Sequence, residues 1–318
     1  MARVIEPDDI DFETYAAATE PALKVRKASA FQEDLERAFV RRGPGDFLPH
    51  MHSTKLGADL EFRPGEVTIW AGYNGHRKSM LTGQVALDLI AAEQRTLSMS
   101  LEMQPSSTLA RMAQQGLAKQ WPTRRDLGDF TAWTDGRLWL FDHVGRISPR
   151  LCLAVLRYFA RELQGQHVFI DSLMKVCQSE ESLDEQKLLM SDLCDVAKET
   201  GLHIHLVHHC RKPSSSGDER PPTKYDLRGA GAVSDLAHNV VTIWANKARR
   251  DAKPGDPKWD DPDALLSVEK QRNGKFEGKV KLWFDDFTLR FVNDATSSVL
   301  PYDIPMRHES RAHFPEAV

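Results

Sequence analysis

The chain has 318 residues and a formal net charge of −4; hydrophobic residues make up 41% of it and charged residues 28%. This is the composition of a globular protein, and it excludes collagen-like, low-complexity and wholly disordered chains as well as a surface that is basic all over. No run approaches the roughly 18 apolar residues of a membrane span, and the acidic start is not a signal peptide, so we expect a cytoplasmic protein without membrane contact (in the bacterial host cytoplasm if a phage or plasmid encodes it).

Residues 1–54 predict an acidic N-terminal arm followed by a linker helix. Six of the first 20 residues are acidic and one is basic, which is typical of a mobile or loosely packed arm. A short helix is expected over 29–42, because Ser29 and Gln32 fit a capping box and apolar residues recur there every four positions. The helix either packs on its own domain or docks on a neighbouring subunit, and the sequence leaves both open.

Residues 55–292 predict one α/β domain in which apolar strands alternate with helices. Strands are expected at 66–72, 95–103, 137–142, 167–171, 202–209 and 239–245, and helices at 78–92, 105–118, 149–164 and 183–200. This alternation predicts a mostly parallel sheet with helices on both faces. Short antiparallel hairpin strands are expected over 264–291, and residues 293–318 are expected to form a flexible tail.

A phosphate-binding loop is expected between the first core strand and the helix that follows it. Its binding residues would be Gly72, Asn74, Gly75, His76, Arg77, Lys78 and Ser79. Backbone N–H groups of such a loop wrap a phosphate chain, and the helix N-terminus adds partial positive charge. Lys78 would reach the outer phosphates and the Ser79 hydroxyl would bind Mg²⁺. The alternative is a basic helix N-terminus without a ligand, where the cations would oppose the helix dipole.

Arg77 stands where the strict pattern G-x-x-x-x-G-K-[ST] has its second glycine. That glycine lets the backbone approach phosphate closely. An arginine in ordinary helical geometry fits if its side chain points away; it can also add a cation near the phosphates or slow turnover, and the sequence does not choose among these. We expect nucleotide binding to survive, with catalysis as the step at risk.

Polar residues also end three further strands, at the edge of a parallel sheet where α/β ligand sites lie. Asp171 is placed to hold Mg²⁺ through water, or else to cap the next segment. Glu102 is placed to orient and deprotonate an attacking water, or else is a capping or surface residue. His208 and His209 follow another strand, where a neutral imidazole can donate to a γ-phosphate, although most histidines are structural.

A long loop rich in Ser, Gly and Pro runs from 211 to 228. Its basic residues are Arg211, Lys212, Arg220, Lys224 and Arg228, and Gly229 follows them. Such a loop suits contact with a nucleic-acid backbone, and the alternative is a solvated surface loop.

Lys270 and Arg272 stand at a strand end before an Asn-Gly turn. A guanidinium there can reach a nucleotide bound by a neighbouring subunit, as an arginine finger does. Exposed arginine beside a turn is also commonplace, so spacing alone leaves this role open.

Together, the ordered segments GYNGHRKS, SLEM, VFIDSL, VHHCRKP, DLRGAGAV and EKQRNG resemble the RecA-type motor domain of hexameric replicative helicases, which includes DnaB, Twinkle and the helicase half of phage primase–helicases. The resemblance covers about residues 55–290 and implies a RecA-like P-loop NTPase core. The catalytic residues that it implies are Glu102 as the base, Asp171 as the Walker B acid, His209 as the phosphate sensor, and Arg272 as a finger acting in trans with Lys270 beside it. The DNA-binding residues that it implies, with Lys224 from the same loop, are Arg211, Lys212, Arg228 and Gly229.

The resemblance implies an ATP-dependent single-stranded DNA translocase and replicative helicase, moving 5′ to 3′, with ATP or another nucleoside triphosphate and Mg²⁺ as cofactors. The implied partners are single-stranded DNA, further copies of the chain in a hexameric ring, and a helicase loader or primase, since no zinc-binding or primase module precedes the motor. Two alternatives stay open: a RecA-family recombinase or mediator that binds single strands, and an ATP-binding protein whose Arg77 impairs hydrolysis.

Overall fold

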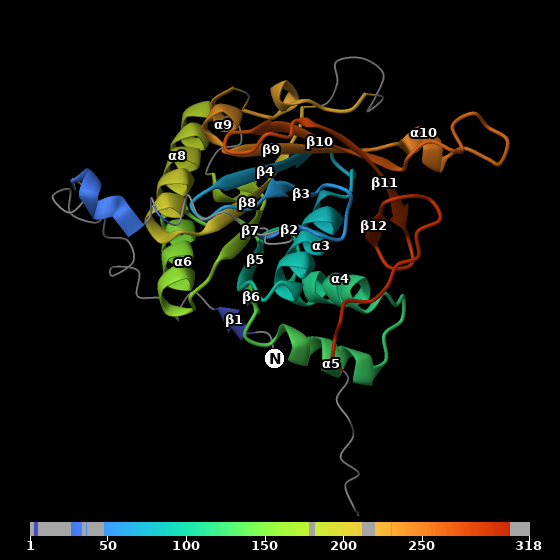
Figure 1. Ribbon diagram of the computed structural model, residues 1–318, viewed down its shortest axis with the longest axis horizontal. Coiled ribbons are helices and arrows are strands. Elements are labelled where there is room, and N and C mark those ends of the chain that lie inside the picture. The colour runs from blue at the N-terminus through green and yellow to red at the C-terminus, as the bar shows by residue number, and fades with distance from the viewer. Residues whose placement is uncertain are drawn as a thin grey trace, which may run out of the picture.

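The structure is a computed structural model that describes residues 3–5, 27–33, 36, 48–177, 182–211, 220–229 and 231–305. Its centre is a ten-stranded sheet (Figure 1). In spatial order the strands are β1 (Arg3–Ile5), β6 (Leu138–Phe141), β5 (Thr96–Ser100), β7 (His167–Asp171), β8 (His203–His209), β4 (Val67–Gly72), β9 (Asn239–Ala245), β10 (Ala264–Gln271), β11 (Gly278–Asp285) and β12 (Arg290–Val292). A second, two-stranded sheet pairs β2 (His50–Met51) with β3 (Gly57–Glu61).

Neighbouring strands are parallel from β1 through β9 and antiparallel from β9 through β12. All residues of β4, VTIWAG, are buried, as expected for a parallel strand covered on both faces. The predicted mostly parallel sheet, with antiparallel strands near the C-terminus, is therefore confirmed. Because the parallel strands point the same way, their carboxyl ends meet at one edge of the sheet.

Helices cover both faces of the sheet and build a hydrophobic core on each (Figure 1). On one face lie α6 (Pro149–Glu162) and α8 (Leu183–Thr200); on the other lie α3 (Lys78–Ala91), α4 (Pro105–Leu117) and α5 (Arg124–Thr134). The described residues also form short helical turns: η3 (Ala28–Phe31), α7 (Leu173–Val176), η4 (Lys224–Asp226), α9 (Gly231–Leu236) and α10 (Lys247–Arg250). In the described part of the chain, no helix is both long and apolar enough to cross a membrane.

The N-terminal segment differs from the expectation in two respects. Arg3–Ile5 form β1 and pair with β6, so this piece of the predicted arm extends the sheet instead of lying loose. The helix expected over 29–42 begins as the 3-10 turn η3, whose N-cap is Lys27 without a side-chain cap, so the capping box at Ser29 is wrong. Residues 34, 35 and 37–42 of that helix lie outside the described residues.

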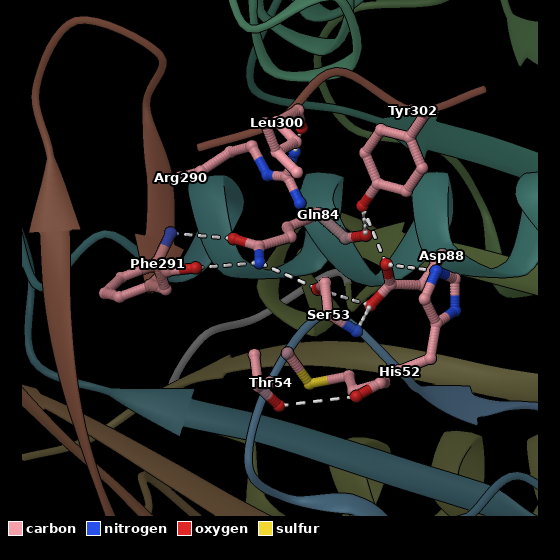
Figure 2. A network of polar contacts seen from close by, with 10 residues as sticks. His52, Ser53, Thr54, Gln84, Asp88, Arg290, Phe291, Leu300 and Tyr302 are labelled. Carbon is pink, nitrogen blue, oxygen red and sulfur yellow. Dashed lines mark hydrogen bonds and ion pairs between the residues drawn. The ribbon is translucent and has the colours of Figure 1, made fainter. Parts of the chain in front are cut away.

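The described part of the predicted tail, residues 293–305, contacts the domain, whereas residues 306–318 lie outside the described residues, so the flexibility of the tail stays a prediction. Tyr302 is buried, and its hydroxyl donates a 2.7 Å hydrogen bond to Asp88 Oδ1 on α3 (Figure 2). Arg290 donates a 2.7 Å hydrogen bond to the carbonyl oxygen of Leu300. The tail therefore holds α3, the helix that begins directly after the predicted phosphate loop.

Candidate nucleotide-binding site

The turn between β4 and α3 is tied to the neighbouring strand β9 at two points. At Gly72 an added Cβ would lie 2.6 Å from the carbonyl oxygen of Ile243, so only glycine fits where β4 ends. His76 is buried, and its Nδ1 accepts a 2.9 Å hydrogen bond from the backbone N–H of Ala245. His76, which the sequence places among the nucleotide-binding residues, therefore anchors the loop as well as lining the cleft beside it.

Lys78 is the first residue of α3, and its ammonium group is enclosed by the loop. Its Nζ donates hydrogen bonds of 3.1 Å to the Gly72 carbonyl and 3.0 Å to the Tyr73 carbonyl, and the residue is 7% exposed. Burial lowers the pKa of Lys78, and the nearby Asp171 carboxylate opposes that shift. A largely buried cation at the start of a helix suits a bound phosphate group, because both the cation and the helix N-terminus favour negative charge.

Ser79 and Asp171 join the first turn of α3 to the end of β7. The Ser79 hydroxyl donates a 2.7 Å hydrogen bond to Asp171 Oδ2. Burial raises the pKa of Asp171, and the hydrogen bond from Ser79 opposes this shift. The N-cap of the next helix, α7, is Ser172, so the alternative role of Asp171 as a cap is not observed. A hydroxyl and a carboxylate oxygen in contact fit the oxygen ligands that Mg²⁺ takes beside a phosphate.

Glu102, two residues beyond β5, faces the end of β8. Its Oε1 accepts a 3.0 Å hydrogen bond from Ser172 Oγ and lies 3.7 Å from His209 Nε2. The interaction with His209 lowers the pKa of Glu102 to about 2, against the effect of burial and with help from Ser172. The carboxylate is therefore ionised at neutral pH; the residue is exposed, and its carboxylate contacts Ser172 and lies beside His209.

These side chains line one cleft of about 550 Å³. Its walls are formed by Asn74, Gly75, His76, Arg77, Lys78, Ser79, Met80, Glu102, Arg111, Asp171, Met174, Lys175, His209 and Arg228. Most of these residues come from the ends of β4, β5, β7 and β8 and from the start of α3, because the carboxyl ends of the parallel strands converge there. The others come from α4 (Arg111), α7 (Met174 and Lys175) and the segment after β8 (Arg228). Arg111 and Lys175 were missed by the sequence reasoning, since isolated basic residues on helices carry no motif.

Arg77 does not adopt the ordinary helical geometry that the sequence suggests for it. Its backbone lies in the left-handed region, with φ 61° and ψ 26°, the conformation for which glycine is normally used. The guanidinium lies 3.7 Å from the ring centre of Phe284 and donates a 3.1 Å hydrogen bond to Asp286. The side chain thus extends to the end of β11, away from Lys78 and Ser79. This agrees with the alternative in which the side chain points away from the site, although the backbone is not helical.

A fixed turn at 220–229 lies beside the cleft. Thr223 and Asp226 form a capping box around η4. The backbone N–H of Arg228 donates to the His209 carbonyl at 3.0 Å, and His208 Nε2 donates to the Arg228 carbonyl at 2.6 Å. Burial lowers the pKa of His208 to about 4, so its ring is neutral at neutral pH. The turn is therefore bonded directly to the strand end that faces Glu102.

The exposed side of this turn carries cations and an aromatic ring. Arg211 is exposed, Lys224 and Arg228 are partly exposed, and Lys212 lies outside the described residues. Tyr225 is 79% exposed, with the Lys224 ammonium 5.6 Å from its ring centre. The sequence reasoning missed Tyr225, although an aromatic residue inside a basic loop is a recognised signal for nucleic-acid contact.

Gly229 ends the turn in a conformation that demands glycine. Its φ is 75°, and an added Cβ would lie 2.1 Å from the side-chain oxygen of Gln186 on α8. Gly229 therefore lets the turn pass close to α8, and this close packing is the role that the structure shows for it.

Lys270 and Arg272 lie far from the cleft of their own chain. Both donate to the Asp235 carbonyl, Lys270 at 2.8 Å and Arg272 at 3.0 Å. The backbone N–H of Arg272 donates to His238, whose own N–H donates to Val67, the first residue of β4. The phosphate loop begins at the other end of this six-residue strand, about 20 Å away. The structure therefore does not bring these two residues to the site within one chain.

Comparisons with known proteins place this fold in a known class. Residues 59–215 match the family model described as AAA domain. One solved ATPase domain has a TM-score of 0.66 and 16% identity, with the match covering 83% of this chain and 96% of that one. A DnaB-like replicative helicase, solved in a study of its interactions with primase, has a TM-score of 0.69 and 15% identity over 86% of this chain and 69% of that one. The fold is thus the RecA-like fold of helicase ATPase domains, as predicted.

Curated relatives carry the same likeness at the level of sequence. The replicative DNA helicase DnaB of Rickettsia bellii is 24% identical over 169 residues, and that of Rickettsia prowazekii is 26% identical over 165 residues. Each match covers 46% of this chain and 34% of the relative, so the alignment spans about one third of the length of these relatives. The predicted likeness to the motor domain of DnaB-type replicative helicases is confirmed at this level.

Proposed function

We propose that this chain is an ATP-hydrolysing motor that moves along single-stranded DNA and acts as a replicative helicase of the DnaB type, in the 5′ to 3′ direction. The observation that carries the proposal is the cleft in which Lys78, Ser79, Asp171, Glu102 and His209 lie together. These are a phosphate-binding cation, two oxygen ligands for a metal ion, a carboxylate and an imidazole, which together are the groups that phosphoanhydride hydrolysis uses.

The substrate class is a nucleoside triphosphate with Mg²⁺, ATP in the first instance. Ser79 and Asp171 would hold the metal ion, which neutralises phosphate charge when bound. Lys78 binds the outer phosphates, exchanging its two loop carbonyls for phosphate oxygens. Glu102 orients the attacking water; with a pKa of about 2 it stays ionised throughout the neutral range.

A complete site requires a second copy of the chain. Arg272 and Lys270 lie at the opposite end of β4 from the phosphate loop, so these two side chains would act on a nucleotide bound by a neighbouring subunit and not on their own. This supports a homo-oligomer with nucleotides at its interfaces, and we propose the hexameric ring of this class. A helicase loader or a primase is the further partner proposed for it, with the cytoplasm as its compartment.

Single-stranded DNA is the proposed ligand of the turn at 220–229. Its exposed side presents Lys224, Arg228 and the Tyr225 ring, with Arg211 on the adjoining strand end. Cations beside an exposed aromatic ring suit a flexible strand, because the cations contact phosphates and the ring stacks on a base. Lys212 and Gly229 complete the set that the family resemblance implies.

The two alternatives make different demands on the structure. In an ATP-binding protein with impaired hydrolysis Arg77 would obstruct the site, but its side chain extends away from Lys78 and Ser79 to Asp286. A recombinase or mediator would assemble as an open filament, which electron microscopy of the protein with DNA distinguishes from closed rings.

The decisive experiment measures ATP hydrolysis with and without single-stranded DNA, together with strand separation from a 5′-tailed duplex. Lys78→Ala removes the phosphate-binding cation and should abolish both activities, whereas Lys281→Ala, an exposed lysine on β11, should leave both unchanged. Arg272→Ala should bind nucleotide but not hydrolyse it, and mixing it with Lys78→Ala should restore part of the activity. A wild-type protein that hydrolyses no ATP and separates no strands contradicts the proposal.

A further inference from the structure

Arg77 is held in a backbone conformation that costs free energy for any residue with a Cβ. Its φ of 61° and ψ of 26° lie in the left-handed region, directly before the first residue of α3. The conformation at this position sets the direction of the N–H groups of Lys78 and Ser79, which open the helix. Such a conformation persists only where the surrounding structure supports it.

The support comes from the end of β11. The Arg77 guanidinium stacks on Phe284 at 3.7 Å and donates a 3.1 Å hydrogen bond to Asp286. Burial lowers the pKa of Arg77 while Asp286 opposes that shift, so the charge is partly removed from water and has one close acidic partner.

The partner surface is itself fixed in place. The Asp285 carboxylate accepts hydrogen bonds of 2.7 Å from both the backbone N–H and the hydroxyl of Thr288. Gln114 on α4 donates a 2.6 Å hydrogen bond to the Phe287 carbonyl, and the ring of Phe284 packs edge-on against Phe291. The turn between β11 and β12 is therefore a firm anchor for the arginine.

We propose that Phe284 and Asp286 are positioning residues of the phosphate loop, which act through Arg77 to keep the loop in its binding conformation. The inference rests on the nucleotide-binding role proposed above. It assigns the hairpin formed by β11 and β12 the function of supporting the conformation of Arg77, which would be unnecessary with a glycine at position 77. Glycine adopts the left-handed conformation without penalty, whereas alanine carries the penalty and has no side chain to reach the hairpin.

The proposal predicts an unusual order of affinities for a non-hydrolysable ATP analogue with Mg²⁺, measured by titration calorimetry on the full chain. Arg77→Gly should bind as tightly as the wild type or more tightly, and Arg77→Ala should bind more weakly. Phe284→Leu and Asp286→Ala should each weaken binding, by roughly threefold to tenfold given the usual strength of cation–π contacts and partly exposed ion pairs.

The decisive comparison places the hairpin substitutions in the Arg77→Gly background. There Phe284→Leu and Asp286→Ala should change the affinity by less than about twofold, because the group through which they act is gone. Glu93→Gly is the matched backbone control: Glu93 has the same φ of 61° just beyond the other end of α3, so this change relieves the same penalty without altering nucleotide affinity.

Melting temperatures of the same variants distinguish an effect on the phosphate loop from a general loss of hairpin stability. A general loss would lower the melting temperature equally with arginine or glycine at position 77. Arg77→Ala binding as tightly as the wild type overturns the proposal. So does an equal loss of affinity for Phe284→Leu with arginine or glycine at position 77, which would mean that the ring touches the nucleotide itself. Lys78→Ala retaining full affinity would instead contradict the nucleotide site as a whole.

Discussion

Three buried histidines make the stability of this domain depend on pH in a direction that the structure specifies. His167 on β7 and His203 and His205 on β8 are almost fully buried, and His167 Nδ1 lies 3.3 Å from His205 Nε2. The ring of His205 stacks on Phe169 with centres 4.1 Å apart. Burial lowers the pKa of His203 to about 3, and it holds the pKa values of His167 and His205 well below the ordinary 6.5.

The unfolded chain binds a proton at each of these histidines below about pH 6.5, whereas the native state does not until far lower pH. Their contribution to the free energy of unfolding is therefore complete above pH 6.5 and is lost as the pH falls from 6.5 toward 3. When the pH falls from 7.5 to 5.5, each histidine lowers the free energy of unfolding by about 1–1.5 kcal/mol, and the three together lower it by about 4 kcal/mol. Asp88 and Asp171, whose pKa values are raised by burial, act in the opposite direction.

Comparing variants isolates one histidine from these other groups. Urea unfolding of the full chain at pH 7.5 and 5.5 gives the change in unfolding free energy for the wild type and for His205→Leu. The variant should lose about 1–1.5 kcal/mol less on acidification, whatever its stability at pH 7.5. His143→Gln, at a partly exposed histidine, is the control and should follow the wild type. Equal pH dependence of His205→Leu and the wild type would refute the reasoning.

Three further predictions test single contacts. Fluorescence anisotropy should show that Tyr225→Ala weakens binding of single-stranded DNA by about tenfold or more, while Tyr225→Phe keeps it. On an abasic strand, which has no base to stack on the ring, Tyr225→Ala and the wild type should bind equally. His209→Ala should raise the pKa of Glu102 from about 2 toward its ordinary 4.5, which moves the acid limb of the ATPase pH profile upward; an unmoved limb contradicts the contact. Tyr302→Phe removes the hydrogen bond to the buried Asp88 and should lower the unfolding free energy by about 1–2 kcal/mol, seen as a lower melting temperature.

The positions of the core strands along the chain and the meeting of their polar ends follow from local patterns in the sequence. Each core strand is a short apolar run whose bounds the structure changes by at most a few residues; HVFID and NVVTIWA match the predicted strands residue for residue. Since parallel strands end at one edge, Asp171, Glu102 and His209 could be placed together without any knowledge of long-range contacts. The cleft was thus predictable because its residues follow the strands directly.

Contacts between distant parts of the chain could not be read in the same way. The conformation of Arg77 depends on Phe284 and Asp286, which lie more than 200 residues along the chain. In the sequence, Tyr302 is one residue of a proline-containing tail. Its hydrogen-bond partner Asp88, a buried carboxyl group on α3, is distant in the sequence and is known only from the structure. Helix α5 was missed because only one face of it is buried and Gly128 interrupts its pattern.

The end of β8 is a structural element that the two proposed sites share. Successive side chains of a strand point to opposite faces, so His209 meets Glu102 while His208 donates to the Arg228 carbonyl. The Arg228 N–H returns a bond to the His209 carbonyl, which ties the two segments by hydrogen bonds in both directions. A shift of β8 at Glu102 must therefore break these bonds or carry the turn with it. Because the ring of His208 is buried, breaking these bonds would leave polar groups unpaired in the core.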